Sequence, residues 1–139
     1  MFDGAYAPMS KTAASITDEI VFENDTIQFG FGHTYETAAE SMIRQGDPAG
    51  RGFTEVLTVP AGTYIEIRKV TSELVNPRAE NGGLCKPDET RWLVFAAVRD
   101  AQDTTKQVAM AAYKGEAAPT PATAAQDLCG TFNYVRASE

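Results

Sequence analysis

A chain of 139 residues with 43% hydrophobic and 22% charged residues has the composition of a folded protein, so we expect one domain over residues 1–139. The net charge of −7 argues against nucleic acid and anionic membrane surfaces as partners. Solubility explains this charge most simply, and a basic protein partner is the alternative. No apolar run is long enough to span a membrane as a helix, and the N-terminus has neither the basic nor the apolar region of a signal peptide.

The first strands are expected as a hairpin near the N-terminus. Glu19–Glu23 alternates apolar and polar residues, as a half-buried strand does. The turn pair Asn24-Asp25 separates it from a second alternating run, residues 26–35, which contains two glycines. Glycines inside a strand often mark a bend.

A short helix and a second hairpin are expected next. Thr37-Ala-Ala-Glu40 matches a capping box, which predicts a helix near residues 37–45. Residues 54–59 and 63–70 are interpreted as strands, with Ile65 and Ile67 facing the core.

The second half of the chain is dominated by an apolar hairpin. Residues 91–99 and 106–114 are apolar on both faces, so both faces of these strands should be covered. Their many alanines imply close packing or space left open for something else. A helical turn near residues 123–128 and a last strand with Phe132 and Tyr134 follow.

These elements predict an all-β protein. About seven or eight short strands with many turns, and no alternation of strands with helices, indicate a single antiparallel β-barrel or curved sandwich carrying one or two short helices.

The two cysteines flank the apolar hairpin, Cys85 before it and Cys129 after it. An antiparallel hairpin brings its ends together, so we predict a Cys85–Cys129 disulfide, with buried free thiols as the alternative. Such a bond would place the protein in the periplasm or outside the cell, its leader being absent from this sequence.

Catalytic and metal-binding motifs are lacking. The lone histidine, His33, has no nucleophile or orienting partner in a recognisable motif, and no Cys or His pair has metal-ligand spacing. We therefore predict no catalytic residue, no metal site and no cofactor. Carboxylates brought together in space could still hydrolyse sugars.

An alternating row in residues 26–35 is the candidate binding face. Phe31, His33 and Tyr35 follow two other apolar residues along it, and aromatic residues with polar tips suit the mouth of a barrel. If a ligand or partner binds, we expect it to contact these three residues and Trp92. The simpler interpretation, which we favour, is that the row packs in the core, because apolar rows in strands usually do.

Gly4-Ala-Tyr6 near the N-terminus and Arg136 near the C-terminus resemble the Gly-x-Trp and late basic residue of lipocalin-like (calycin) barrels, with Tyr6 in place of tryptophan. The resemblance implies that this aromatic and this cation pack together to close the barrel's base. Small acidic periplasmic barrels that inhibit lysozyme are similar in size and charge.

The expected function is that of a non-catalytic secreted or periplasmic binding protein, for a small apolar ligand in the barrel or a basic protein such as a lysozyme-type enzyme. A carboxylate-based hydrolase and a structural cell-envelope component are the alternatives. The barrel interior should separate them: a polar cavity favours an enzyme, an open apolar cavity a carrier, and a filled core a surface-binding role.

Overall fold

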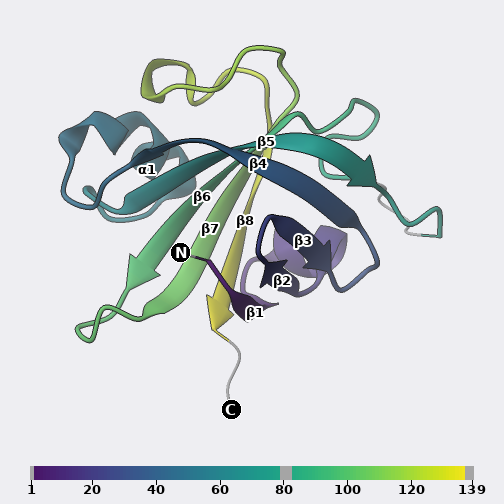
Figure 1. The fold of residues 1–139 in the computed structure, drawn as a ribbon, viewed down its shortest axis with the longest axis horizontal. Coiled ribbons are helices and arrows are strands. Elements are labelled where there is room, and N and C mark those ends of the chain that lie inside the picture. Colours follow the sequence, from purple (N-terminus) through teal and green to yellow (C-terminus); the bar gives the residue numbers. More distant parts are fainter. Residues whose placement is uncertain (1, 79–82, 137–139) are drawn as a thin grey trace.

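The computed structural model describes residues 2–78 and 83–136. Eight antiparallel strands form a closed barrel in which each strand pairs with the next along the chain and β8 pairs with β1 (Figure 1). The strands are β1 (Gly4–Pro8), β2 (Ile20–Glu23), β3 (Thr26–Phe29), β4 (Thr34–Ile43), β5 (Tyr64–Leu74), β6 (Trp92–Arg99), β7 (Thr105–Tyr113) and β8 (Leu128–Arg136). This architecture confirms the predicted all-β antiparallel barrel and is compatible with a calycin-like fold.

Helical structure is confined to short pieces. The helix α1 (Arg51–Leu57) follows a 3-10 turn at Pro48–Gly50, and further single turns lie at Ala13–Thr17 and Pro121–Thr123. Asp47 caps the start of the 3-10 turn at Pro48–Gly50, because its carboxylate accepts a hydrogen bond of 2.9 Å from the amide of Ala49. Among the described residues, no helix is both long and apolar enough to cross a membrane.

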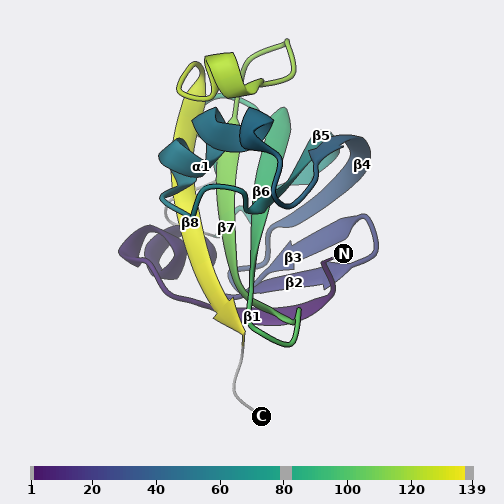
Figure 2. The same ribbon diagram turned by 90° about the vertical axis from the view of Figure 1, so that its left-hand side faces the viewer.

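The outer face of β6 and β7 is covered by α1, which lies across these strands in Figure 2. Phe53 and Leu57 on the helix are almost completely buried. They pack in one cluster with small and β-branched residues of the sheet: Ile65, Ile67, Val94, Ala96, Ala109 and Ala111. The alanines predicted to allow close packing therefore provide the surface on which the helix sits.

Large aromatic side chains fill the barrel interior. The rings of Phe2, Phe22 and Phe95 lie 5.2–5.5 Å apart, centre to centre. The guanidinium of Arg68 stands 5.4–5.8 Å from the centres of all three rings, and its Nε lies 3.0 Å from a carboxylate oxygen of Glu66. The side chains of Arg68 and Glu66 are 5% and 14% exposed, so this ion pair belongs to the packed interior.

The helix predicted near residues 37–45 is wrong, because this segment belongs to β4. The hydroxyl of Thr37 does not cap a helix but donates to the carbonyl of Asp25, and residues 37–43 pair with β5. The strand predicted at residues 54–59 is also wrong, since most of it lies in α1. Its apolar residues are buried on one side only, against the barrel wall.

Two further predictions are wrong, one about the extent of a strand and one about which side chains point into the barrel. Residues 26–35 do not form one strand, because a tight turn at residues 30–33 separates β3 from β4. Ile65 and Ile67 face α1 outside the barrel, whereas Tyr64 on the alternate face of β5 packs inside. The helix expected near residues 123–128 is reduced to the 3-10 turn at Pro121–Thr123 and the turn after it.

The first and last strands meet at the seam of the barrel. Tyr6 on β1 is paired with Arg136 on β8, and the guanidinium lies 5.5 Å from the centre of the tyrosine ring. The aromatic–cation contact implied by the calycin resemblance is therefore present, with tyrosine as the aromatic residue.

Candidate functional site

The end of the barrel at which β3 passes into β4 carries the candidate site. Three segments meet there: the turn at residues 30–33, the end of β5 with Val75 and Asn76, and the segment 83–90 that leads into β6. Asn76 joins the first two, because its side-chain amide donates to the carbonyl of Phe31 at 2.8 Å. The three segments therefore form one continuous surface.

A disulfide between Cys85 and Cys129 fixes the third segment, as predicted, with the Cα atoms 5.1 Å apart. Cys129 lies at the start of β8, so the bond ties the segment 83–90 to the barrel wall. Gly83 lies close over the end of β5: a side chain there would meet Glu73 and Val75 at 2.9 Å. The segment therefore forms a fixed cover at this end of the barrel.

His33 and Tyr35 support this end from inside, and both are completely buried. The Nδ1 atom of His33 accepts a hydrogen bond of 3.1 Å from the backbone amide of Asn76. The hydroxyl of Tyr35 donates to Glu73 at 2.6 Å and accepts from the amide of Leu84 at 3.2 Å. Each ring thus connects β4 to a neighbouring segment of the site.

Glu73 is the centre of this hydrogen-bond network. Its carboxylate accepts from the hydroxyl of Tyr35, and from the hydroxyl and amide of Thr90 at 2.6 and 3.0 Å. Burial raises the pKa of Tyr35, and the hydrogen bond to Glu73 raises this pKa further. Both effects favour the protonated hydroxyl, which donates to Glu73.

Exposed apolar side chains surround the network. Phe31, Leu74 and Val75 are 40%, 62% and 36% exposed, and we call these three residues the apolar rim. Leu74 is paired with Thr34 at the start of β4, and the turn bearing Phe31 is bonded to Asn76, next to Val75. Scattered exposed hydrophobic residues are ordinary, but a group on one edge of a domain is typical of an interaction surface.

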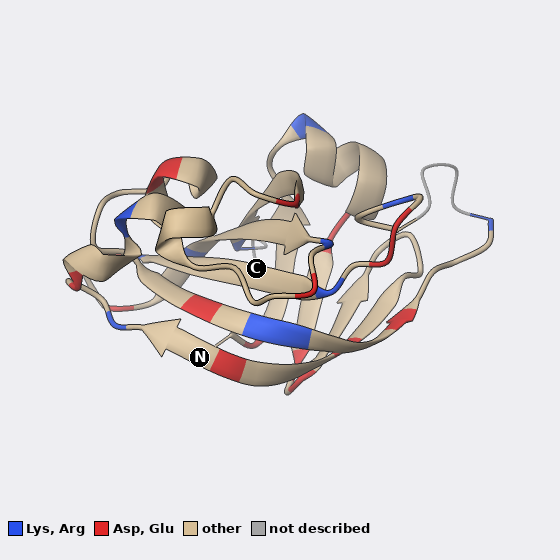
Figure 3. Cartoon of the chain, turned by 90° about the horizontal axis from the view of Figure 1, so that it is seen from above, with Lys and Arg blue, Asp and Glu red and all other residues tan. Residues whose placement is uncertain are grey.

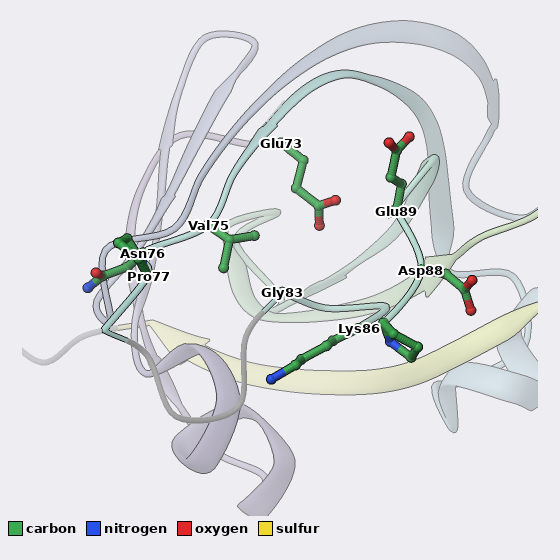
Figure 4. Close-up of a pocket in the computed structure, with 9 residues that line it drawn as sticks. Glu73, Val75, Asn76, Pro77, Gly83, Lys86, Asp88 and Glu89 are labelled. Atoms are coloured by element: carbon green, nitrogen blue, oxygen red, sulfur yellow. The ribbon is translucent and has the colours of Figure 1, made fainter.

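A pocket of about 380 Å³ opens beside the apolar rim. Figure 4 shows the side chains of Glu73 and Val75 directed toward its middle, while Lys86 and Asp88 extend away from the Glu73 carboxylate. Within residues 2–78 and 83–136, no group of three or more His, Cys, Asp or Glu side chains is arranged to hold a metal ion. The pocket offers hydrogen-bond acceptors and an apolar wall.

Of the residues expected from the sequence to contact a ligand, Phe31, His33 and Tyr35 lie together at this end, but only Phe31 is exposed. Trp92 lies apart from them, on the outer face of β6, where its indole nitrogen donates to the carbonyl of Gly115 at 3.0 Å. Sequence reasoning missed Glu73 and Leu74. Strict alternation from Tyr64 would have placed Glu73 outside, and a register shift between Glu36 and Thr37 brings it opposite Tyr35 instead. The sequence contains no signal that joins Glu73 to Tyr35 and Thr90.

The acidic charge is unevenly distributed over the molecule. Residues 2–43 contain seven carboxylate residues and one basic residue, Lys11, so they account for most of the net charge of −7. Six of the seven carboxylate residues are exposed, and Asp18 is partly exposed. Figure 3 shows acidic positions along β4 and in the turns near it, and α1 covers the other side of the barrel. We call the outer face of β1–β4 the acidic wall.

The amino-acid sequence matches no protein-family model, and comparisons with curated proteins and with solved structures gave no significant match.

Proposed function

We propose that this chain is a non-catalytic binding protein that docks a basic protein partner on the end of the barrel that carries the apolar rim. The observation that carries the proposal is the contrast between interior and surface. Aromatic rings and the Arg68–Glu66 pair fill the barrel, whereas Phe31, Leu74 and Val75 stand exposed beside the pocket. A filled barrel favours recognition on the outside over a small apolar ligand within.

The acidic wall supports a basic partner. It adjoins the apolar rim, because Gly30, next to Phe31, donates its amide to the carbonyl of Glu19 and lies against the side chain of Asp18. Charges of one sign on one side of a protein accelerate encounters with a partner of opposite charge. The apolar rim would then supply the desolvated contacts that slow dissociation.

The disulfide supports a location in the periplasm or outside the cell, because such bonds form and persist in oxidising compartments. Together with the resemblance in size and charge to lysozyme-inhibiting barrels, this makes a lysozyme-type enzyme a suitable first partner to test. A carboxylate-based hydrolase is less well supported. Three protein donors already bind the carboxylate of Glu73, and the other two carboxylates that line the pocket, Asp88 and Glu89, have cations of their own.

The proposal is tested by calorimetric titration of the protein with a c-type lysozyme, and with cytochrome c as a second basic protein. We expect binding to lysozyme, and the double variant Phe31→Ser/Leu74→Ser should weaken it by about tenfold or more, as loss of central apolar contacts does. The control is Val135→Ser, which removes an apolar side chain, 36% exposed, at the other end of the barrel.

Equal weakening by both substitutions, or no weakening by the double variant, would contradict docking at the apolar rim. Equal affinity for lysozyme and cytochrome c, lost in moderate salt, would show attraction by charge alone. Absence of binding to either protein would remove a basic partner of this class from the proposal.

A further inference from the structure

Glu73 is held as a hydrogen-bond acceptor at the edge of the pocket. All three of its partners are donors: the hydroxyl of Tyr35, and the hydroxyl and amide of Thr90. A carboxylate offers about four acceptor positions, so these donors leave about one open. In Figure 4 the carboxylate points toward the middle of the pocket.

The charge of Glu73 is not neutralised by a neighbour within the described part of the chain. The other two carboxylates of the pocket have cations of their own, Asp88 with Lys114 at 3.4 Å and Glu89 with Arg91 at 3.7 Å. Lys86 lines the pocket but makes no ion pair with a described carboxylate, and its side chain extends away from Glu73. A carboxylate that is partly buried without a counter-ion favours a cation brought from outside.

The walls suit the stem of a long cationic side chain. Val75 projects into the pocket and Pro87 also lines it, so an aliphatic chain would find apolar contact before its charged end reaches Glu73. The pocket has a volume of about 380 Å³ and is open rather than enclosed, and Val75 of the apolar rim forms part of its lining. An entering side chain therefore need not displace any part of the barrel wall.

We propose that this pocket receives a lysine or arginine side chain of the protein partner, with Glu73 as its counter-ion and Val75 and Pro87 along its stem. That this side chain belongs to a protein partner rests on the proposed function. The binding site itself rests on the pocket and its unneutralised carboxylate. It gives the basic partner a specific contact in addition to general attraction by the acidic wall.

The test is an NMR titration with capped tripeptides, Gly-Lys-Gly, Gly-Arg-Gly and Gly-norleucine-Gly. Norleucine keeps the aliphatic stem of lysine without its charge. We expect the lysine and arginine peptides to bind weakly and to shift the amide signals of Gly83, Leu84 and Thr90. The ammonium group of lysine donates a charged hydrogen bond to the carboxylate, whereas the norleucine side chain donates none. The norleucine peptide should therefore bind about tenfold more weakly.

Variants complete the test. Glu73→Gln should weaken binding of the lysine peptide about tenfold, whereas Glu55→Gln, a carboxylate on α1, should leave it unchanged. Lys86→Gln should strengthen binding roughly twofold to threefold, because it removes a positive charge from the lining of the pocket that repels an incoming cation. Since Lys86 is exposed, this variant remains informative if Glu73→Gln does not fold.

Equal binding of the norleucine peptide, shifts confined to the acidic wall, or no gain from Lys86→Gln would overturn the inference. The titration contains no partner protein, so its outcome is independent of the lysozyme experiment. Lysine-peptide binding without lysozyme binding would contradict the proposed partner and leave the pocket intact. The reverse result would keep docking at the apolar rim and remove the cation site.

Discussion

Arg68 is the residue whose setting differs most from what its chemistry suggests. Its guanidinium lies among the rings of Phe2, Phe22 and Phe95, inside a barrel whose interior is otherwise mainly apolar. Glu66 two positions earlier supplies the counter-charge at 3.0 Å. Such a pair is tolerated inside a protein only while both members are present, because a lone buried charge is costly.

Arg68→Ala should therefore destabilise the protein by about 3 kcal/mol or more, because it strands the Glu66 carboxylate and leaves a void between the rings. The double variant Glu66→Gln/Arg68→Met removes both charges and keeps most of the volume. Its loss of stability should be much smaller. Urea denaturation followed by tryptophan fluorescence measures the free energy of unfolding of both variants. A double variant as unstable as Arg68→Ala would contradict this explanation, because it leaves neither a lone buried charge nor a large void.

The buried tyrosines predict how stability changes in alkali. Burial raises the pKa of Tyr113 to about 12, and it also raises the pKa of Tyr35 and of Tyr134. An unfolded chain releases its tyrosine protons near pH 10, before the folded chain does. Stability should therefore be constant up to about pH 10 and fall as the pH rises toward 12. Urea midpoints at successive pH values check this, and Tyr113→Phe should show a smaller loss.

At the scale of elements, the segment 83–90 depends on attachments that are far apart in the sequence. The disulfide ties it to β8, Leu84 donates its amide to Tyr35, and Thr90 donates twice to Glu73. These contacts hold a segment without regular secondary structure as one wall of the pocket. The pocket should therefore be the first part of the molecule to respond when the disulfide is removed.

Cys85→Ala/Cys129→Ala should lower the free energy of unfolding by roughly 2–4 kcal/mol, because the bond closes a long loop in the unfolded chain. Hydrogen exchange should accelerate in residues 83–90 more than in β6 and β7. Protein purified without reductant should yield no alkylated thiol on mass spectrometry. Free thiols in that material would contradict the disulfide itself.

The sequence predicted elements well where alternation or apolar runs were strong, as in β2, β6 and β7, and where two cysteines flanked one hairpin. It failed at residues 37–45, where a local capping pattern was overridden by pairing with β5. It also failed for Ile65 and Ile67, because both faces of β5 are covered and alternation alone does not say which is inside. A local sequence pattern does not show which other segment of the chain will pair with it or cover its face.

The candidate site was predicted only in part, for the same reason. Phe31, His33 and Tyr35 lie near one end of the barrel, where the turn at residues 30–33 leaves the first exposed while the other two are buried. Leu74 belongs to the apolar rim because the end of β5 meets that turn, a contact between segments that are far apart in the sequence. A site made by three separate segments is a property of the closed barrel.

At the scale of the whole molecule, charge and shape divide the surface into an acidic wall and a side covered by α1. Attraction by the wall should act mainly on the rate of association with a basic protein. We expect Glu23→Gln/Glu36→Gln to slow association with lysozyme severalfold at low salt and to change dissociation little, as measured by surface plasmon resonance. An effect on dissociation alone would indicate that these carboxylates lie inside the interface.

The most direct test of the central claim, docking at the barrel end, is amide hydrogen exchange of the protein alone and in complex with lysozyme. The proposed function predicts slower exchange in the complex at the turn of residues 30–33, at residues 73–77 and at residues 83–90. Exchange should be unchanged in α1 and at the Tyr6–Arg136 seam. Slower exchange over α1 or the seam, with none at the apolar rim, would contradict it.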